Sequence, residues 1–188
     1  MKTVKRTLGK IALAGIVVIS ISCKDGNKNN VAETTITNEV TITENLNQDA
    51  KAEVFLKDYF NLKNALVGDD NAKAKQLGGT LASSLKAFEA SGYSSSEQSE
   101  LKDILEDATE HAEHIRESDI KHQREHFKTL SKDVTDMVAI TGTKAKLYEQ
   151  FCPMYDGGTA WLSTEKQVLN PYYGSSMLKC GKITKTIE

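Results

Sequence analysis

Proline is missing from the first 152 residues of the chain, and the whole sequence has only two prolines, one tryptophan and three cysteines. Because proline interrupts helices, its absence allows the charged, alanine-rich upstream part to be helical. Both prolines, the tryptophan and two cysteines lie together in "FCPMYDGGTAWLSTEKQVLNPYYGSSMLKCG", residues 151–181. The sequence therefore divides into a long part of helical character and a short C-terminal part in which rigid, aromatic and sulfur-bearing residues gather.

The sequence also has few motifs that are typical of enzymes. No nucleophile elbow is present, and no glycine-rich phosphate loop follows a strand. The acidic pair Asp69-Asp70 is better explained as a helix cap than as a general acid and base. Cys152 could act as a nucleophile with a histidine as its base, but the following proline and the second cysteine favour a redox or metal role. We therefore predict that the chain is not an enzyme.

The N-terminus has the composition of an export signal. A basic start precedes an apolar run over 11–21, which is too short for a comfortable bilayer span. Ser22 and Cys23 then resemble a bacterial lipobox, although Ser20 stands where leucine is more usual. We predict a signal peptide over 1–22 and a lipid on Cys23, which would anchor the chain to a cell-envelope membrane and face the periplasm or the outer surface. Secretion without lipid and a retained membrane anchor are the alternatives.

Excess positive charge is also lacking. Removal of the signal peptide takes Lys plus Arg from 24 to 20 against 26 acids, so the net charge changes from −2 to −6. A mildly acidic exported protein is a poor candidate for nucleic acid or for anionic lipid headgroups. Residues 23–48 are rich in Asn, Thr and Glu and predict a disordered tether of about 25–30 Å. Residues 49–188 fit one domain with a single core.

Apolar residues recur at helical spacing in four segments of that domain. The expected stripes run through 55–66, 74–88, 101–115 and 120–138. Gly78 and Gly79 weaken the second helix by about 1 kcal/mol each unless a close neighbour uses the space. Ser118-Asp119 separates the last two stripes, although one long helix through 118 is an alternative. Short connections favour antiparallel neighbours, so we expect an all-α fold, an up-and-down four-helix bundle.

The C-terminal part, about 148–188, breaks this pattern. Pro153 and Pro171 interrupt helices, and Gly157-Gly158 marks a turn. After a turn at "NPYYG", the run "MLKCGKITKTI" predicts a short strand. We expect a compact, loop-rich cap with short β elements, packed on the bundle.

Four sulfurs of the cap form a mirrored pattern. Cys152 and Met154 sit two apart, whereas Met177 and Cys180 sit three apart. Positions two apart in an extended segment point to the same side. Thiolate and thioether are soft ligands and suit Cu(I) best, with Ag(I), Zn or Cu(II) as alternatives. The competing interpretation is a Cys152–Cys180 disulfide, which is common in exported proteins and would stabilise the fold by roughly 3–4 kcal/mol.

Several quoted segments carry a resemblance to a known family. "YFNLKNALVGDD", "DIKHQREHFKTLS", "YEQFCPMYDGGTAWLS" and "NPYYGSSMLKCGKI" resemble a bacterial exported domain family of unknown function over nearly all of residues 50–188. Its members occur as lipoproteins and as extensions of periplasmic adaptor subunits in copper and silver efflux systems. The resemblance implies metal handling in the cell envelope and efflux adaptor or transporter components as partners, but it supplies no mechanism.

All four histidines lie close together in the sequence. They fall within "EHAEHIRESDIKHQREHF" and are His111, His114, His122 and His126. A turn near Ser118 would bring both pairs level on antiparallel helices, where imidazoles could hold Cu(II), Zn or Ni or join the sulfur site. The alternative is ordinary solvated histidines, because no carboxylate-anchored ligand set is evident in the sequence. His126 lies in a segment that resembles the family and is the first to test.

Taken together, the sequence predicts a lipid-anchored, heavy-metal-binding protein of the cell envelope, copper above all, acting as a metallochaperone or accessory to efflux. The alternative is a structural or interaction lipoprotein stapled by a disulfide.

Overall fold

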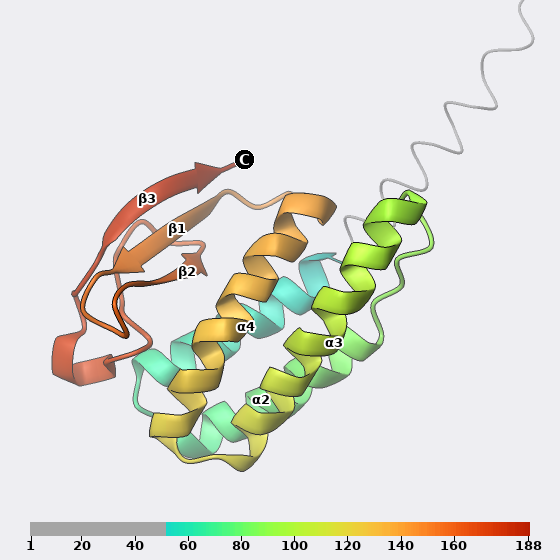
Figure 1. The fold of residues 1–188 in the computed structure, drawn as a ribbon. Coiled ribbons are helices and arrows are strands. Elements are labelled where there is room, and N and C mark those ends of the chain that lie inside the picture. The colour runs from blue at the N-terminus through green and yellow to red at the C-terminus, as the bar shows by residue number, and fades with distance from the viewer. Residues whose placement is uncertain (1–51) are drawn as a thin grey trace, which may run out of the picture. The chain divides into compact units, whose positions relative to one another are not determined.

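The structure, a computed structural model, describes residues 52–188. The predicted signal peptide (1–22), the lipidation site Cys23, the tether (23–48) and the predicted start of the domain at 49 lie outside the described residues. The described part contains four helices followed by a three-stranded antiparallel sheet (Figure 1). The helical bundle expected from the sequence is confirmed in this coarser form, and the sheet takes the fold beyond a purely all-α description.

Each helix follows one of the predicted apolar stripes. The helices cover 52–67, Asn71–Lys86 (α2), Ser95–Glu117 (α3) and Ile120–Thr141 (α4). Side-chain caps fix three of the starts. Asp70 accepts a hydrogen bond from the backbone N–H of Lys73, and Ser94 forms a capping box with Glu97. None of the helices in the described part is both long and apolar enough to cross a membrane.

The last two helices are separate, which decides a point that the sequence left open. Ser118 is extended, and the Asp119 side chain accepts from the N–H of His122, 3.0 Å away, to begin α4. The chain therefore reverses at the predicted Ser118-Asp119 boundary, and α3 packs along α4 (Figure 1).

Gly78 permits the closest helix contact. A Cβ atom placed there would lie 2.9 Å from the carbonyl oxygen of Ala112 and 2.9 Å from Cγ2 of Ile115. Real carbon atoms do not approach so closely, so α2 and α3 can pack at this distance only with glycine. The helical cost of glycine is offset by packing between α2 and α3.

The sheet is formed entirely by the C-terminal part. Its strands are Leu147–Cys152 (β1), Thr159–Ser163 (β2) and Lys182–Ile187 (β3), in the order β2-β1-β3. β1 pairs with both neighbours and shifts register between Glu149 and Gln150 in its pairing with β3. The strand expected within "MLKCGKITKTI" is β3, but it begins only at Lys182, because Gly174–Met177 forms a 3-10 turn.

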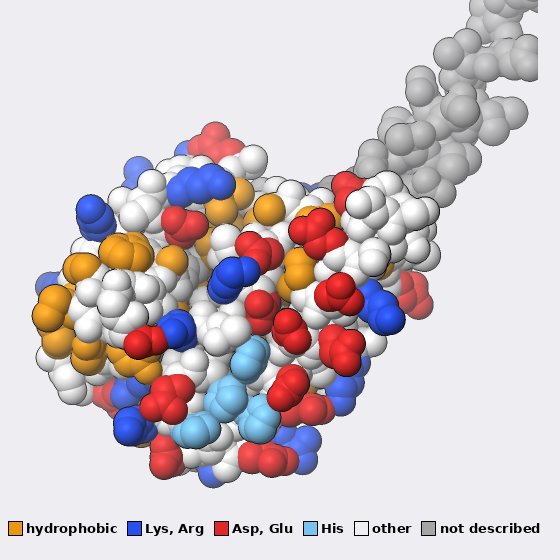
Figure 2. All heavy atoms as spheres, in the orientation of Figure 1, with side chains coloured by type: hydrophobic (Ala, Val, Ile, Leu, Met, Phe, Trp, Pro, Cys, Tyr) orange, Lys and Arg blue, Asp and Glu red, His pale blue; other side chains and the backbone are white. Residues whose placement is uncertain are grey.

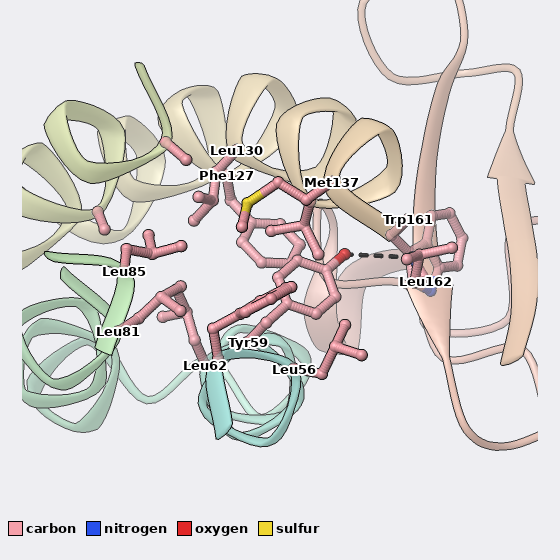
Figure 3. Close-up of a cluster of buried hydrophobic side chains, with 14 of the residues drawn as sticks. Leu56, Tyr59, Leu62, Leu81, Leu85, Phe127, Leu130, Met137, Trp161 and Leu162 are labelled. Carbon is pink, nitrogen blue, oxygen red and sulfur yellow. Dashed lines mark hydrogen bonds between the residues drawn. The ribbon is translucent and has the colours of Figure 1, made fainter. Parts of the chain in front are cut away.

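Tyr59 joins the helices to the sheet at the centre of the core. Its ring stacks on Phe127 with centroids 5.3 Å apart, and its hydroxyl lies 2.9 Å from Oγ of Ser131. The same hydroxyl accepts from the N–H of Leu162 in β2, at 3.1 Å, as Figure 3 shows. Trp161 is also fully buried against this core. The C-terminal part is therefore integral to the fold, packed on the α4 side of the helices (Figure 1).

Candidate functional site

The two cysteines of the C-terminal part lie against each other. Cys152 ends β1 and Cys180 stands two residues before β3, and their Sγ atoms are 2.8 Å apart. Both are free cysteines. Cys152 is buried, whereas Cys180 is half-buried. We call these two residues the cysteine pair. It places one thiol inside the protein and one at the surface.

The surroundings of Cys152 favour its thiolate. Burial raises the pKa of the Cys152 thiol, but hydrogen bonds to the sulfur outweigh burial and hold that pKa below the ordinary value. The donors are the Cys180 thiol, the backbone N–H groups of Met154 and Tyr155, and the Asn170 amide. The hydrogen bond to Cys152 in turn raises the pKa of Cys180. Cys152 is therefore the sulfur that loses its proton first.

Asn170 is the organising residue that sequence reasoning missed. Its side chain is fully buried, and its amide N–H donates to the carbonyl oxygen of Cys180 at 2.9 Å. Its Oδ1 accepts from the backbone N–H groups of Tyr172 and Tyr173. The sequence "NPYYG" indicated a turn here, but no local pattern shows that its asparagine reaches the cysteines.

The loop that carries Asn170 is fixed to the bundle by Arg124 of α4. Its guanidinium donates to the carbonyl oxygens of Pro171 and Leu66 and pairs with Asp69. Hydrogen bonds from Ser175 and Arg124 lower the pKa of Asp69 to about 2. This clamp explains how a loop far along the chain holds the cysteine pair in register.

The two methionines do not lie buried with the cysteines. Met154 is 62% exposed and Met177 is 39% exposed. Their backbones are close to the cysteine pair, because Met154 follows Cys152 by two residues and the Cys180 N–H donates to the carbonyl oxygen of Met177. Among the described residues, then, the structure brings together the two thiols of the predicted four-sulfur set.

The four histidines form a second group on the surface, the histidine cluster: His111 and His114 from α3, and His122 and His126 from α4. The ring centroid of His126 lies 4.5 Å from that of His114, 5.0 Å from that of His122 and 5.2 Å from that of His111. Figure 2 shows them as one contiguous patch among acidic side chains. The predicted turn at Ser118 has therefore brought both pairs level.

Two carboxylates contact this cluster. Oε1 of Glu110 lies 3.5 Å from Nε2 of His114, and Oε2 of Glu125 lies 3.2 Å from Nδ1 of His122. The sequence did not make such partners evident, although they follow from helical spacings of three and four residues. Burial lowers the pKa of His111 and of His126, so both favour the neutral form.

The two groups belong to different elements, because the cysteine pair lies at the end of β1 and before β3 and the histidine cluster lies on α3 and α4. A cleft lined by Glu125, Lys128, Tyr155, Asp156 and Tyr173 lies between α4 and the loop after β1. Over residues 52–188, no three histidine, cysteine, aspartate or glutamate side chains are arranged to hold a metal ion as they stand. The predicted metal residues are thus gathered into a thiol pair and an imidazole cluster rather than one joint site.

Comparison with known proteins adds a family match. Residues 55–146 match the model of a family described as a protein of unknown function, DUF3347. The matched segment spans most of the first helix, α2, α3 and α4, including the histidine cluster, and ends directly before β1. Neither the curated proteins nor the solved structures give a match.

Proposed function

We propose that this chain is a lipid-anchored, heavy-metal-binding protein of the cell envelope that captures Cu(I) through Cys152 and Cys180. The observation that carries the proposal is the 2.8 Å approach of the two Sγ atoms. The helices, running up and down, serve as the scaffold. The export signal and the lipidation site Cys23 are sequence predictions that place the protein outside the cytoplasm.

The chemistry of the pair supports a soft, monovalent ion. Thiolates are the ligands that Cu(I) and Ag(I) prefer, and a metal-bound thiol must lose its proton. Cys152 is prepared for this by the hydrogen bonds to its sulfur. Half-buried Cys180 is the side from which an ion or an acceptor protein would approach.

A metal ion needs more room between the sulfurs than they have now. Two metal–sulfur bonds of about 2.3 Å place the sulfurs up to about 4.6 Å apart when the ion lies in line between them. The sulfur of Cys180 would therefore move outward by roughly 2 Å through side-chain rotation, while its backbone stays hydrogen-bonded to Asn170 and Met177. Exposed Met154 and Met177 would then supply thioether ligands for exchange with an efflux adaptor or transporter.

The same distance favours a second candidate function. A pair of thiols at this separation needs only a small shift to form a disulfide, with loss of two protons and two electrons to an oxidant of the exported compartment. The protein would then be an interaction lipoprotein in which Cys152 and Cys180 are structural. Enzymatic activity is part of neither proposal.

Thiol titration of the purified, unreduced mature domain separates the two. Metal binding predicts two reactive thiols and about one Cu(I) per chain in competition with a chelator. Absence of free thiols, together with no Cu(I) uptake after mild reduction, would overturn it. If the pair binds metal, the Cys180→Ser variant should lose Cu(I) affinity and keep its helicity. If the pair is a structural disulfide, the same variant should lose stability against unfolding. Met154→Leu is the matched control, expected to weaken affinity far less than Cys180→Ser.

A further inference from the structure

We infer that the histidine cluster is a second metal site, for a borderline divalent ion such as Cu(II) or Ni(II), independent of the cysteine pair. His111 and His126 are its anchor, and His114 and His122 complete it. The site goes beyond the Cu(I) function, because it uses imidazole nitrogen rather than sulfur and is formed by α3 and α4 rather than by the C-terminal part.

The anchor has the separation that two ligands of one ion require. Nδ1 of His111 lies 2.9 Å from Nδ1 of His126. Two metal–nitrogen bonds of about 2.0–2.1 Å place their nitrogens about 2.9 Å apart at a right angle and about 3.3 Å apart at the tetrahedral angle. The observed distance is near both values, so the two nitrogens lie within the range that one ion spans. Imidazole ligands bind Cu(II) more tightly than Zn by the general order of divalent-metal affinity.

One hydrogen must move before both rings of the anchor can bind an ion. At 2.9 Å, one Nδ1 carries a hydrogen and donates it to the other. Moving that hydrogen to Nε2 of the same ring frees both Nδ1 lone pairs without changing the net charge. The ion therefore replaces a hydrogen bond, and a small turn of the two rings directs both lone pairs to one point.

The other two imidazoles are oriented by carboxylates. Glu110 holds Nε2 of His114 and Glu125 holds Nδ1 of His122, so the opposite nitrogen of each ring remains available. A carboxylate behind a histidine is the common support of a metal-bound imidazole. The His114 ring lies parallel to that of His126, at 2° with centroids 4.5 Å apart, so side-chain rotation must turn its Nδ1 toward the ion. Both rings are more than half exposed and lie at the surface, where such rotation is unhindered.

Charge around the cluster favours a cation. Glu110 and Asp107 act on His111 with negative charge, and Glu125 acts on His126 in the same way. Figure 2 shows acidic side chains around the four histidines. A field of this sign raises the local concentration of divalent ions and attracts them to the exposed rings.

The test is titration of CuCl₂ and NiCl₂ into the mature chain carrying Cys152→Ser and Cys180→Ser. Removing both thiols makes the outcome independent of the Cu(I) proposal. We expect one saturable site per chain, nitrogen hyperfine structure in the Cu(II) electron paramagnetic resonance spectrum, and weaker binding of Zn. The cysteine background must first show wild-type helicity by circular dichroism.

Variants of that background locate the site. His126→Asn should abolish saturable binding, and Glu125→Gln should weaken it about 10–100-fold, as expected for a supporting carboxylate. Lys102→Ala, an exposed lysine near the start of α3, is the control and should bind as well as the parent. Unsaturable uptake, or equal affinity in His126→Asn and Lys102→Ala, would overturn the inference. Loss of Cu(I) binding by the wild-type chain would leave it untouched.

Discussion

The cysteine pair and the histidine cluster are built in opposite ways. The cysteines lie 28 residues apart and meet through strand pairing and a loop clamped to the bundle. The histidines span 16 residues and meet because two helices reverse at one turn. One group offers soft thiols, one of them buried, whereas the other offers imidazoles, two of them half-buried and two exposed. The cysteine pair therefore depends on the whole tertiary fold, whereas the histidine cluster depends on the packing of α3 and α4 alone.

Trp161→Ala should have the largest effect, and it should disturb the cysteine pair while leaving the histidine cluster unchanged. The buried indole fills the space between β1, Tyr172 and the backbone at Gly181, beside Cys180. Its loss should reduce the free energy of unfolding by about 3–5 kcal/mol. In urea unfolding followed by circular dichroism, we expect a lower midpoint but preserved helices. Thiol reactivity of Cys152 should rise, while Ni(II) binding by the histidine cluster stays the same. Equal disturbance of both groups would contradict the comparison.

Tyr59→Phe tests the hydrogen-bonded contact between the helices and the sheet. The substitution keeps the stacked ring but leaves the buried N–H of Leu162 without its acceptor. We expect a loss of about 1–3 kcal/mol in the free energy of unfolding. Hydrogen exchange should accelerate in β2 more than in α3. Uniform acceleration across the chain would show that the sheet and the bundle open as one unit.

Gly78→Ala should affect the histidine cluster more than the cysteine pair. Its Cβ would force α3 away from α2 at Ala112 and Ile115, which directly follow His111 and His114. Overpacking of about 1–3 kcal/mol is partly offset by the better helix propensity of alanine, so we expect a net loss of about 1–2 kcal/mol. Divalent-metal affinity should fall while thiol titration remains unchanged. Gly79→Ala is the matched control, since its Cβ meets only the flexible side chain of Arg116, at 3.1 Å.

Asp133→Asn should have the smallest effect and should stabilise the protein. Burial, followed by the negative charge of Asp107, raises the pKa of Asp133 to about 6 from 3.8. The folded state then binds the proton more tightly than the unfolded chain, so the carboxyl lowers stability as pH rises from about 4 to about 6. We expect the variant to gain about 1–2 kcal/mol at pH 7 and nothing at pH 4. A gain that is equal at both pH values would rule out the titration of Asp133 as its cause.

Much of the bundle was predictable because its information is local. The apolar stripes located the four helices, and Asp70, Ser94 and Asp119 cap them as hydrogen-bonding residues do before an amphipathic run. The turn at Ser118 also placed the four histidines level. The carboxylates of Glu110 and Glu125 could have been found from the same helical spacing.

The C-terminal part was harder to predict from the sequence. Its β elements were expected, but the order β2-β1-β3 pairs strands from the two ends of a 41-residue segment, and no local rule selects it. The four-sulfur set was predicted from spacing alone, and spacing does not reveal that Met154 and Met177 are exposed while the cysteines meet. Asn170 was missed because its amide reaches Cys180, ten residues further along the chain, and the sulfur of Cys152 at the end of β1.

The helices, their caps, the turn between α3 and α4 and the gathering of imidazoles follow from the amino-acid sequence, because each depends on residues within a few helical turns of one another. The meeting of Cys152 and Cys180, the hydrogen bond from Asn170 and the clamp by Arg124 depend on how the distant parts of the chain pack. Those contacts join residues far apart in the chain, and they form only where a shared core, centred on Tyr59 and Trp161, brings the helices and the sheet together.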